Sequence, residues 1–302
     1  SKTAAPKQEK SAKKPQSTQV KKEKTAEKPK RNGSNSGRSG TKMPKTAAKA
    51  AAAAKTTMTE NSSNVSDMRQ PPARRAVKKT PIRIIPLGGL SEIGKNMTLY
   101  ECGQDMFIVD CGLSFPDPDM LGVDLVIPDI SYLLDNKDKV KGFVITHGHE
   151  DHIGSLPYIL QQLNVPIYAT KLTMAIIENK LREHNLINNV KRKVVTYGQY
   201  INLGDFRIEF IRTNHSIADS AALAIYTPAG IVVHTGDFKV DYTPVFGDTI
   251  DLARFGELGK KGVLALMCDS TNVLNPGFTE SERTVGKTFD TIFEENAKSR
   301  II

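Results

Sequence analysis

The stretch of sequence that decides the fold reads Thr146-His147-Gly148-His149-Glu150-Asp151-His152. It follows directly on residues 142–145, an apolar run that is typical of a short buried strand. On a helix, residues two apart point in nearly opposite directions, so His147 and His149 could not share a bound ion there. On a turn that leaves a strand they can. The sequence therefore predicts that these imidazoles gather at the exit of a strand.

The types of residue in this stretch indicate a metal site. Imidazole nitrogen and carboxylate oxygen are donors that suit Zn²⁺ or a similar divalent ion. Asp151 and His152 are adjacent and aim at a point next to the one that His147 and His149 share. The motif therefore predicts two ligand pairs for two metal ions. The plainer alternative is a polar turn that happens to be rich in histidine.

Two further predicted strands end in candidate ligands. His215 lies in Thr213-Asn214-His215-Ser216, and Asp237 lies in Thr235-Gly236-Asp237-Phe238. We expect His215 to join the first metal ion and Asp237 to bridge both ions, since a carboxylate has two oxygens. Two ions about 3.5–4 Å apart can hold one hydroxide between them at neutral pH. We therefore expect a hydrolytic centre in which His149, Asp151 and Asp237 are the residues most important for catalysis.

Two more residues are expected beside the ligands. Asp110 ends a predicted strand, and ligating imidazoles generally need an outer partner that fixes their orientation. His234 lies three residues before Asp237, and we expect it to be a core residue or an outer partner of a ligand. His184 falls on the exposed side of a predicted helix and is not expected to take part in chemistry. Taken singly, Asp110 and Asp237 are also compatible with turn aspartates, and His215 with a surface residue.

The 302-residue chain consists of two parts with different compositions. Residues 1–80 hold 21 Lys and Arg against 5 Asp and Glu, whereas the remainder holds 21 against 28, so the overall net charge of +9 comes entirely from the first part. That part is rich in Lys, Ala, Ser, Thr and Pro and has no aromatic residue. It cannot bury enough apolar surface to offset chain entropy, which predicts a disordered basic tail. Such a tail attracts polyanions, above all RNA or other nucleic acid; the alternative is a solubilising extension.

The sequence also indicates the compartment. No apolar run approaches the ~20 residues that span a bilayer, and no secretory signal is evident. The cysteines, Cys102, Cys111 and Cys268, are odd in number and lack CxxC spacing. They are predicted to be reduced core thiols, which is typical of a cytoplasmic protein without membrane contact.

Hydrophobic periodicity predicts an α/β fold. The expected strands are residues 82–87, 97–101, 106–110, 142–145, 166–170, 194–197, 206–212, 221–227, 230–234 and 263–267. The expected helices are residues 153–163, 171–186 and 282–298, and residues 115–129 are expected to form a long loop. Hairpins mixed with helices that cover the outside indicate an αββα sandwich, sheet against sheet, with helical outer layers.

At these residues the chain resembles the metallo-β-lactamase superfamily, whose signature is His-x-His-x-Asp-His, and within it the ribonuclease J family of RNA-processing enzymes. The blocks that carry the resemblance are 88–97 (GGLSEIGKNM), 146–158 (THGHEDHIGSLPY), 214–220 (NHSIADS), 234–239 (HTGDFK) and 269–282 (DSTNVLNPGFTESE). The last block resembles the start of the β-CASP domain that nucleic-acid-processing members insert into the core. The resemblance implies three parts: a tail at 1–80, the first part of a metallo-β-lactamase core at 81–270, and the start of a truncated β-CASP domain at 271–302.

The resemblance also implies roles for single residues. His147, His149 and His215 would bind one metal ion, Asp151 and His152 the other, and Asp237 would bridge. Asp269 matches an acidic position at the start of the β-CASP domain, where the family often has Glu. The implied cofactors are two divalent ions, Zn²⁺ first, with Mn²⁺ or Mg²⁺ as alternatives.

The implied activity is cleavage of RNA as a 5′→3′ exoribonuclease and an endoribonuclease, in rRNA processing and mRNA decay. Assembly as a homodimer or homotetramer and contact with an RNA helicase are implied by the family alone. Members of that family are much longer, and the histidine that completes their second metal site lies downstream, whereas no residue after His234 in this chain is histidine. The resemblance therefore predicts an N-terminal portion with an incomplete second metal site and little or no activity by itself.

Other functions are compatible with parts of this pattern. A thioester or lactone hydrolase shares the histidine motif but needs neither the block at 269–282 nor a basic tail. A DNA-repair nuclease shares more, although its motifs around the metal differ from THGHEDHIG. A non-enzymatic alternative is an RNA-binding or assembly fragment that acts through residues 1–80.

Overall fold

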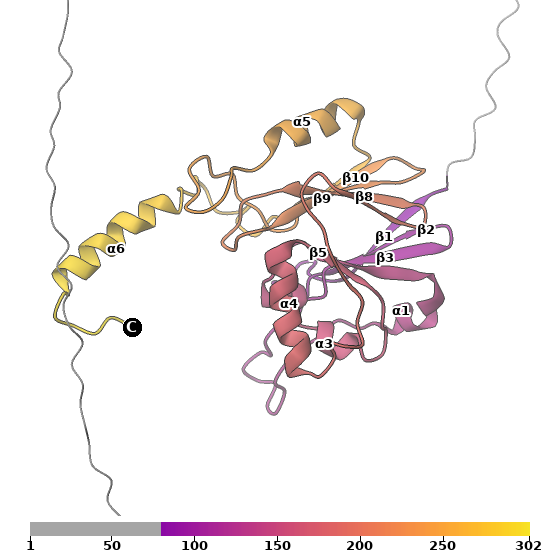
Figure 1. Ribbon diagram of the computed structural model, residues 1–302, viewed down its shortest axis with the longest axis horizontal. Helices are drawn as coiled ribbons and strands as arrows, with labels where there is room; N and C mark the ends of the chain where they lie inside the picture. The colour runs from indigo at the N-terminus through magenta and orange to yellow at the C-terminus, as the bar shows by residue number, and fades with distance from the viewer. Residues whose placement is uncertain (1–79) are drawn as a thin grey trace, which may run out of the picture. The chain divides into compact units, whose positions relative to one another are not determined.

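The computed structural model describes residues 80–302, whose architecture is built on two β-sheets (Figure 1). The predicted disordered tail therefore lies, except for Thr80, outside the described residues. The first sheet contains, in spatial order, β1 (Ile82–Gly88), β2 (Met97–Cys102), β3 (Asp105–Val109), β4 (Val140–Val144), β5 (Ile167–Ala169) and β6 (Arg192–Val194). The second contains β11 (Ala265–Met267), β10 (Ile231–His234), β9 (Ala221–Tyr226), β8 (Phe206–Arg212) and β7 (Tyr200–Leu203).

The pairing within each sheet follows from the connections. In the first sheet, β1, β2 and β3 are antiparallel; a tight turn at Gly103 (φ +60°) joins β2 to β3, and a loop at 89–96 joins β1 to β2. From β3 to β6 the pairing is parallel, so each connection must cross over the sheet. In the second sheet, β7 to β10 are antiparallel and β11 pairs parallel with β10.

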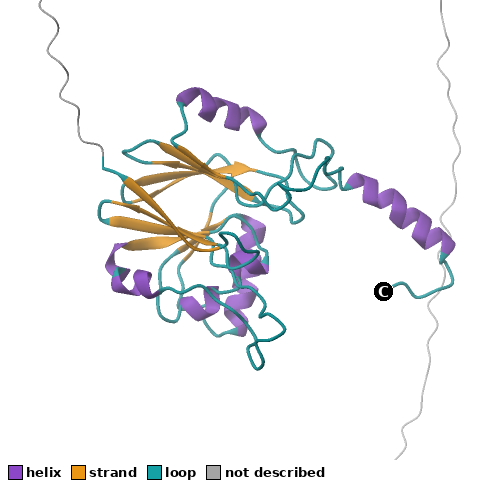
Figure 2. Ribbon diagram, turned by 180° about the vertical axis from the view of Figure 1, so that it is seen from behind, coloured by secondary structure: helices purple, strands orange, loops and turns teal. Residues whose placement is uncertain are grey.

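Helices occupy the crossovers and cover the outer faces of the sheets (Figure 2). Beside the first sheet lie α1 (Ser131–Asp135), η1 (Lys137–Lys139), α2 (Glu150–Ile153), α3 (Leu156–Ile159) and α4 (Lys171–Glu183). The second sheet is covered by α5 (Leu252–Lys261). The last helix, α6 (Arg283–Glu295), has no buried residue.

Side-chain alternation along the strands shows where the core lies. In β3, Phe107 and Val109 pack between the sheets, while Met106 and Ile108 pack toward the helices of the first sheet. In β9, Leu223 belongs to the core between the sheets, whereas Ala222 and Ala224 contribute to the cluster beneath α5. Since successive side chains of a strand point to opposite faces, each sheet is apolar on both faces. The predicted αββα sandwich is confirmed.

One predicted helix is wrong in its continuity. Residues 153–163 are predicted to form one helix, but within them only Ile153, the last residue of α2, and Leu156–Ile159 (α3) are helical, with a break at Gly154 and Ser155. The backbone N–H of Ser155 leaves the helical pattern and donates to the carbonyl of Cys111, 3.0 Å away. Pro157 has no N–H to donate. A tertiary hydrogen bond and a proline therefore divide a segment whose hydrophobic pattern is helical.

Other elements differ from the predictions in extent. The strand expected at 194–197 lies at Arg192–Val194. Neither β7 nor α5 was predicted. Strand β7 has only four residues, and α5 contains Gly256 and Gly259, which lower helix propensity by about 1 kcal/mol each. The long loop at 115–129 is confirmed, apart from an isolated bridge between Ser114 and Val126.

A buried ion pair fastens α5 to the second sheet. Arg254 donates from Nε and Nη2 to the two carboxylate oxygens of Glu209, each at 2.8 Å. The Tyr226 hydroxyl donates to the same carboxylate at 2.9 Å. Burial alone would raise the pKa of Glu209, but the hydrogen bonds from Arg254 and Tyr226 hold it below its usual value. The ion pair thus joins β8, β9 and α5 in one polar cluster.

Replacing Arg254 with Met should lower the free energy of unfolding by about 1–3 kcal/mol, because Glu209 keeps its hydrogen bond from Tyr226 but loses a charged partner that is itself partly exposed. Because the folded-state pKa of Glu209 is depressed, the loss is fully present above pH 4.5 and shrinks as the pH falls through the folded pKa. Urea denaturation at several pH values measures both effects. Arg182→Met is the control, since its pair with Glu178 is exposed and should contribute less than about 1 kcal/mol. Equal losses in the two variants would contradict the assignment.

Candidate metal centre

The site lies where strands of both sheets end. Strand β4 leads into the turn of His147 and His149, β8 leads to His215, and β10 leads to Asp237. The backbone N–H of Ala221, at the start of β9, donates to the carbonyl of Thr146 at 2.9 Å and so ties the two sheets together at this edge. Strand ends of the two sheets therefore meet at one place.

Close backbone approach at this edge requires glycine at two positions. Gly236 has a positive φ of +56°, and a Cβ atom there would lie 2.9 Å from Cβ of Thr146 in the other sheet. A Cβ atom on Gly112 would lie 1.5 Å from the carbonyl oxygen of Asp151. The turns that carry the candidate ligands can approach one another only because these side chains are missing.

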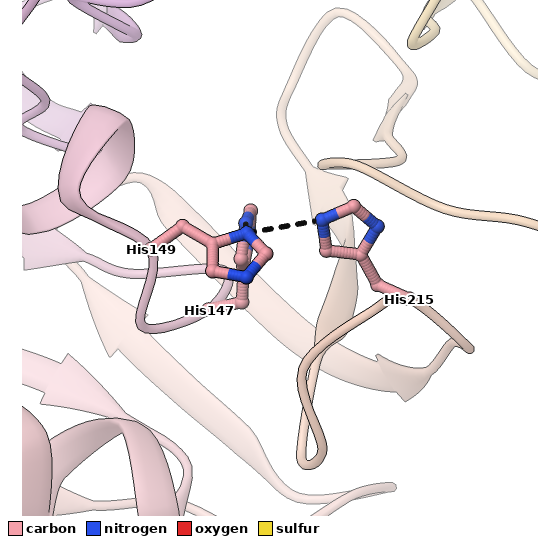
Figure 3. Close-up of side chains that lie close together, drawn as sticks. All are labelled: His147, His149 and His215. Atoms are coloured by element: carbon pink, nitrogen blue, oxygen red, sulfur yellow. Dashed lines mark hydrogen bonds between the residues drawn. The ribbon is translucent and has the colours of Figure 1, made fainter. Parts of the chain in front are cut away.

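Three histidines form the first candidate group. Nδ1 of His149 lies 3.1 Å from Nε2 of His147 and 3.1 Å from Nε2 of His215 (Figure 3). One nitrogen of each ring lies within 4.8 Å of the others, a spacing that one metal ion can span. His147 is fully buried, and the other two are partly buried. The structure thus brings together the three residues that the sequence assigned to one ion.

A second candidate group adjoins the first. His147, His152 and Asp237 also place ligand atoms within 4.8 Å of one another. Nε2 of His152 lies 3.4 Å from Oδ1 of Asp237 and 3.5 Å from Oδ2 of Asp151. The other oxygen of Asp237, Oδ2, lies 3.7 Å from Nε2 of His215. One oxygen of Asp237 therefore faces each group, which is the geometry that a bridging carboxylate needs.

Asp110 lies beneath the second group and fixes its orientation. This carboxylate is buried and adopts the left-handed conformation (φ +62°) directly after β3. Its Oδ2 lies 2.8 Å from Nδ1 of His152. It also accepts hydrogen bonds from the backbone N–H and the hydroxyl of Thr146. With Nδ1 of His152 held by Asp110, Nε2 is directed at Asp151 and Asp237.

The imidazoles respond differently to burial. Burial lowers the pKa of His147 far below its usual value, and the neighbouring His152, His215 and His149 lower it further. Burial also lowers the pKa of His215. In His152, burial alone would lower the pKa, but Asp110 raises it well above its usual value. His147 and His215 are therefore neutral and have a lone pair for a metal ion, whereas binding of a metal at His152 must displace a proton.

Sequence reasoning missed Asn96, which supports this group from the first sheet. Its Nδ2 lies 3.1 Å from Nε2 of His152 and donates to Oδ2 of Asp151 at 3.2 Å. Its backbone N–H donates to the carbonyl of Asp151 at 3.0 Å. An asparagine after a glycine-rich turn carries no signal of its own, and its role depends on a partner 55 residues away.

A cavity of about 630 Å³ opens beside the second group. Its wall includes Asp151, His152 and Asp237, together with His234 and Asp269. Neither His234 nor Asp269 belongs to a metal-ligand group among residues 80–302. Asp269 accepts hydrogen bonds from the backbone N–H and the hydroxyl of Thr271. His184 lies elsewhere, at the end of α4 against Tyr158.

Comparison with known proteins places this site in a recognised family. The profile of the Metallo-beta-lactamase superfamily matches residues 91–256. The protein named Ribonuclease J from Synechocystis sp. is 47% identical over 223 residues, which are 73% of this chain and 35% of that protein. Ribonuclease J from Helicobacter pylori (strain 26695) is 48% identical over 225 residues, 74% of this chain and 32% of that protein. The chain thus spans about a third of the length of the curated relatives it matches.

A solved structure supports the fold alone. The crystal structure of a protein of unknown function from Enterococcus faecalis V583 superposes with a TM-score of 0.51 at 18% identity. The match covers 72% of this chain and 58% of the other. Within residues 80–302, no helix is both long and apolar enough to cross a membrane.

Replacing Asp110 with Asn should weaken metal binding by about 10- to 100-fold, because an outer partner of a ligating histidine is lost while its shape is kept. Competition with a chromophoric chelator measures the affinity, and elemental analysis measures the stoichiometry. Asp205→Asn, in the exposed turn between β7 and β8, is the matched control and should bind metal like the wild type. Unchanged affinity in Asp110→Asn would show that Asp110 does not position a ligand.

Proposed function

Because the chain belongs to the metallo-β-lactamase superfamily and, within it, to the ribonuclease J family, we propose that it takes part in metal-dependent hydrolysis of RNA phosphodiester bonds. The observation that carries the proposal is Asp237, whose two oxygens face a three-histidine group on one side and His152 on the other. The relatives named Ribonuclease J support RNA as the substrate.

The side chains fit divalent metal ions in number and type. His147, His149 and His215 would hold one ion, His152 and Asp151 the other, and Asp237 would contact both. Nitrogen-rich ligand sets favour Zn²⁺, with Mn²⁺ or Mg²⁺ as alternatives. Bound divalent ions supply a Lewis acid and lower the pKa of a water molecule. The protein's own contribution is to hold the ligands: Asp110 keeps Nδ1 of His152 engaged, and Asn96 restrains Asp151.

On the basis of the family we also propose 5′→3′ exonuclease and endonuclease action, with roles in rRNA processing and mRNA decay. We further propose a cytoplasmic location, assembly as a dimer or tetramer, and contact with an RNA helicase. The division into a metallo-β-lactamase part at 81–270 and a β-CASP part at 271–302 is proposed on the same basis.

The alternative hydrolases are less well supported. A thioester or lactone hydrolase or a DNA-repair nuclease would share the three-histidine group, but the relatives at 43–48% identity carry the name Ribonuclease J. A fragment that only binds RNA would have no use for a buried carboxylate that orients a histidine toward two further carboxylates. The geometry of Asp110 and His152 therefore favours the enzyme.

Replacing His149 with Ala should lower whatever RNA cleavage the chain shows with Mn²⁺ or Zn²⁺ by more than about 100-fold. A direct ligand should matter at least as much as an outer partner, whose loss costs about 10- to 100-fold. Prior removal of metal with a chelator should have the same effect, and added metal should restore only the wild type. Single-stranded RNA and DNA of one sequence, with His184→Ala as control, test the reaction and its substrate. Normal cleavage by His149→Ala would disprove the catalytic assignment.

Deletion of residues 1–79 should weaken RNA binding and flatten its dependence on salt, because the deleted segment carries all of the chain's net positive charge. Metal content and the cleavage step should be unchanged, since all candidate ligands lie beyond residue 145. Filter binding at several salt concentrations measures the slope. The pure RNA-binding alternative predicts the opposite pattern, in which the deletion abolishes all function and His149→Ala changes nothing.

A further inference from the structure

His234 is an imidazole beside the metal centre that neither candidate metal group includes. It ends β10, three residues before Asp237, and lines the same cavity as Asp110, His152 and Asp237. It is partly exposed, unlike the fully buried His147. From the cavity wall, its ring can present either a hydrogen-bond donor or an acceptor to a bound molecule.

One ring nitrogen of His234 is occupied by a tyrosine from the other sheet. The Tyr100 hydroxyl lies 2.7 Å from Nδ1 of His234. Tyr100 is fully buried in the core between the sheets, stacked on Phe107 at 5.1 Å between ring centroids. Among residues 80–302, His234 is the hydrogen-bond partner that the structure gives this hydroxyl.

The contact decides which nitrogen carries the proton. Burial raises the pKa of Tyr100 well above its usual value, so the phenol keeps its hydrogen. That hydrogen needs an acceptor in the dry core, and Nδ1 of His234 is the one within reach. Burial lowers the pKa of His234, so its ring is neutral. A neutral imidazole that accepts at Nδ1 carries its proton on Nε2.

The protonated nitrogen, Nε2, is open to the cavity. Within the described part of the chain, no hydrogen bond joins it to another residue. Among residues 80–302, Thr213 Oγ1 is the one side-chain nitrogen or oxygen atom that is buried and has no hydrogen-bond partner. Nε2 of His234 is therefore not fully enclosed, and His234 belongs to the wall of the cavity.

We propose that Nε2–H of His234 donates a hydrogen bond to an anionic phosphate oxygen of the substrate, with Tyr100 as the positioning residue that fixes this tautomer. The proposal rests on the proposed function. The cavity wall carries Asp110, Asp151, Asp237 and Asp269, which repel a phosphate. A neutral ring with a fixed donor favours the phosphate without competing for metal, because its Nδ1 lone pair is already engaged. His234 therefore offers an N–H donor to the substrate, whereas the ligand histidines offer lone pairs to a metal ion.

The first test needs no substitution in the catalytic machinery. Nitrogen-15 NMR of the metal-free chain reports which nitrogen of each imidazole is protonated, and His184→Asn helps to assign the signals. We expect the Nε2–H tautomer for His234 and, in Tyr100→Phe, a mixture of tautomers. An Nδ1–H tautomer in the wild type would overturn the proposal, because Nε2 would then offer a lone pair and act as a metal ligand.

The second test measures binding of inorganic phosphate to the zinc-loaded chain by phosphorus-31 NMR titration. His234→Asn should keep an acceptor near Tyr100 but place no donor at the position of Nε2, because its side chain is too short. It should therefore weaken phosphate binding by about 10- to 100-fold, as for loss of a hydrogen bond to a charged group. His234→Gln, whose amide nitrogen reaches the position of Nε2, should recover part of the loss. Zinc stoichiometry should stay at the wild-type value in both variants.

The outcomes separate this inference from the proposed function. Wild-type-like phosphate affinity in His234→Asn, loss of zinc from it, or no measurable phosphate binding by the wild type would each overturn the donor role. If phosphate binding depends on His234 while His149→Ala and removal of metal leave RNA cleavage unchanged, the donor role is supported and the ribonuclease proposal fails.

Discussion

The site depends on one buried carboxylate. Asp110 holds the backbone and hydroxyl of Thr146 on one side and Nδ1 of His152 on the other. Burial of a charged group is costly unless the group is fully hydrogen-bonded. The hydrogen-bond partners of Asp110 are therefore held in fixed positions. Thr146 in turn accepts from Ala221 of the second sheet. A single carboxylate therefore aligns the turn that carries three histidines and the junction between the sheets.

The electrostatics of the site follow from where each imidazole stands. His147 lies among other imidazoles in a buried position, which keeps it neutral. His152 lies against Asp110, whose charge raises the pKa of this imidazole well above its usual value. His234 lies against a phenol rather than a carboxylate, which makes it an acceptor at one nitrogen and a donor at the other. Three kinds of neighbour thus give three different roles to histidine side chains at one site.

The outer layers and the site are separate in their physical basis. The helices α4 and α5 are held by apolar clusters and, for α5, by the pair of Arg254 and Glu209. None of these contacts includes a candidate ligand. The ligands lie on turns that leave β4, β8 and β10 and, for Asp151 and His152, in the single helical turn α2. Stability and chemistry therefore reside in different contacts of one scaffold, which allows substitutions to test them independently.

The sequence by itself determined the fold class, most strands and the set of candidate ligands, because hydrophobic periodicity and the spacing of His147, His149 and His152 are local properties. It also pointed to His215 and Asp237 at strand ends. The tertiary structure decided what local patterns cannot encode. It divided the helix after His152 through a hydrogen bond to Cys111, placed Asn96 on Asp151, and brought Tyr100 to His234 across the core. These contacts join residues 44 to 134 positions apart. The contacts of Cys111 and Asn96 form when distant strands of the first sheet come together, whereas the contact of Tyr100 with His234 forms only when the two sheets pack face to face.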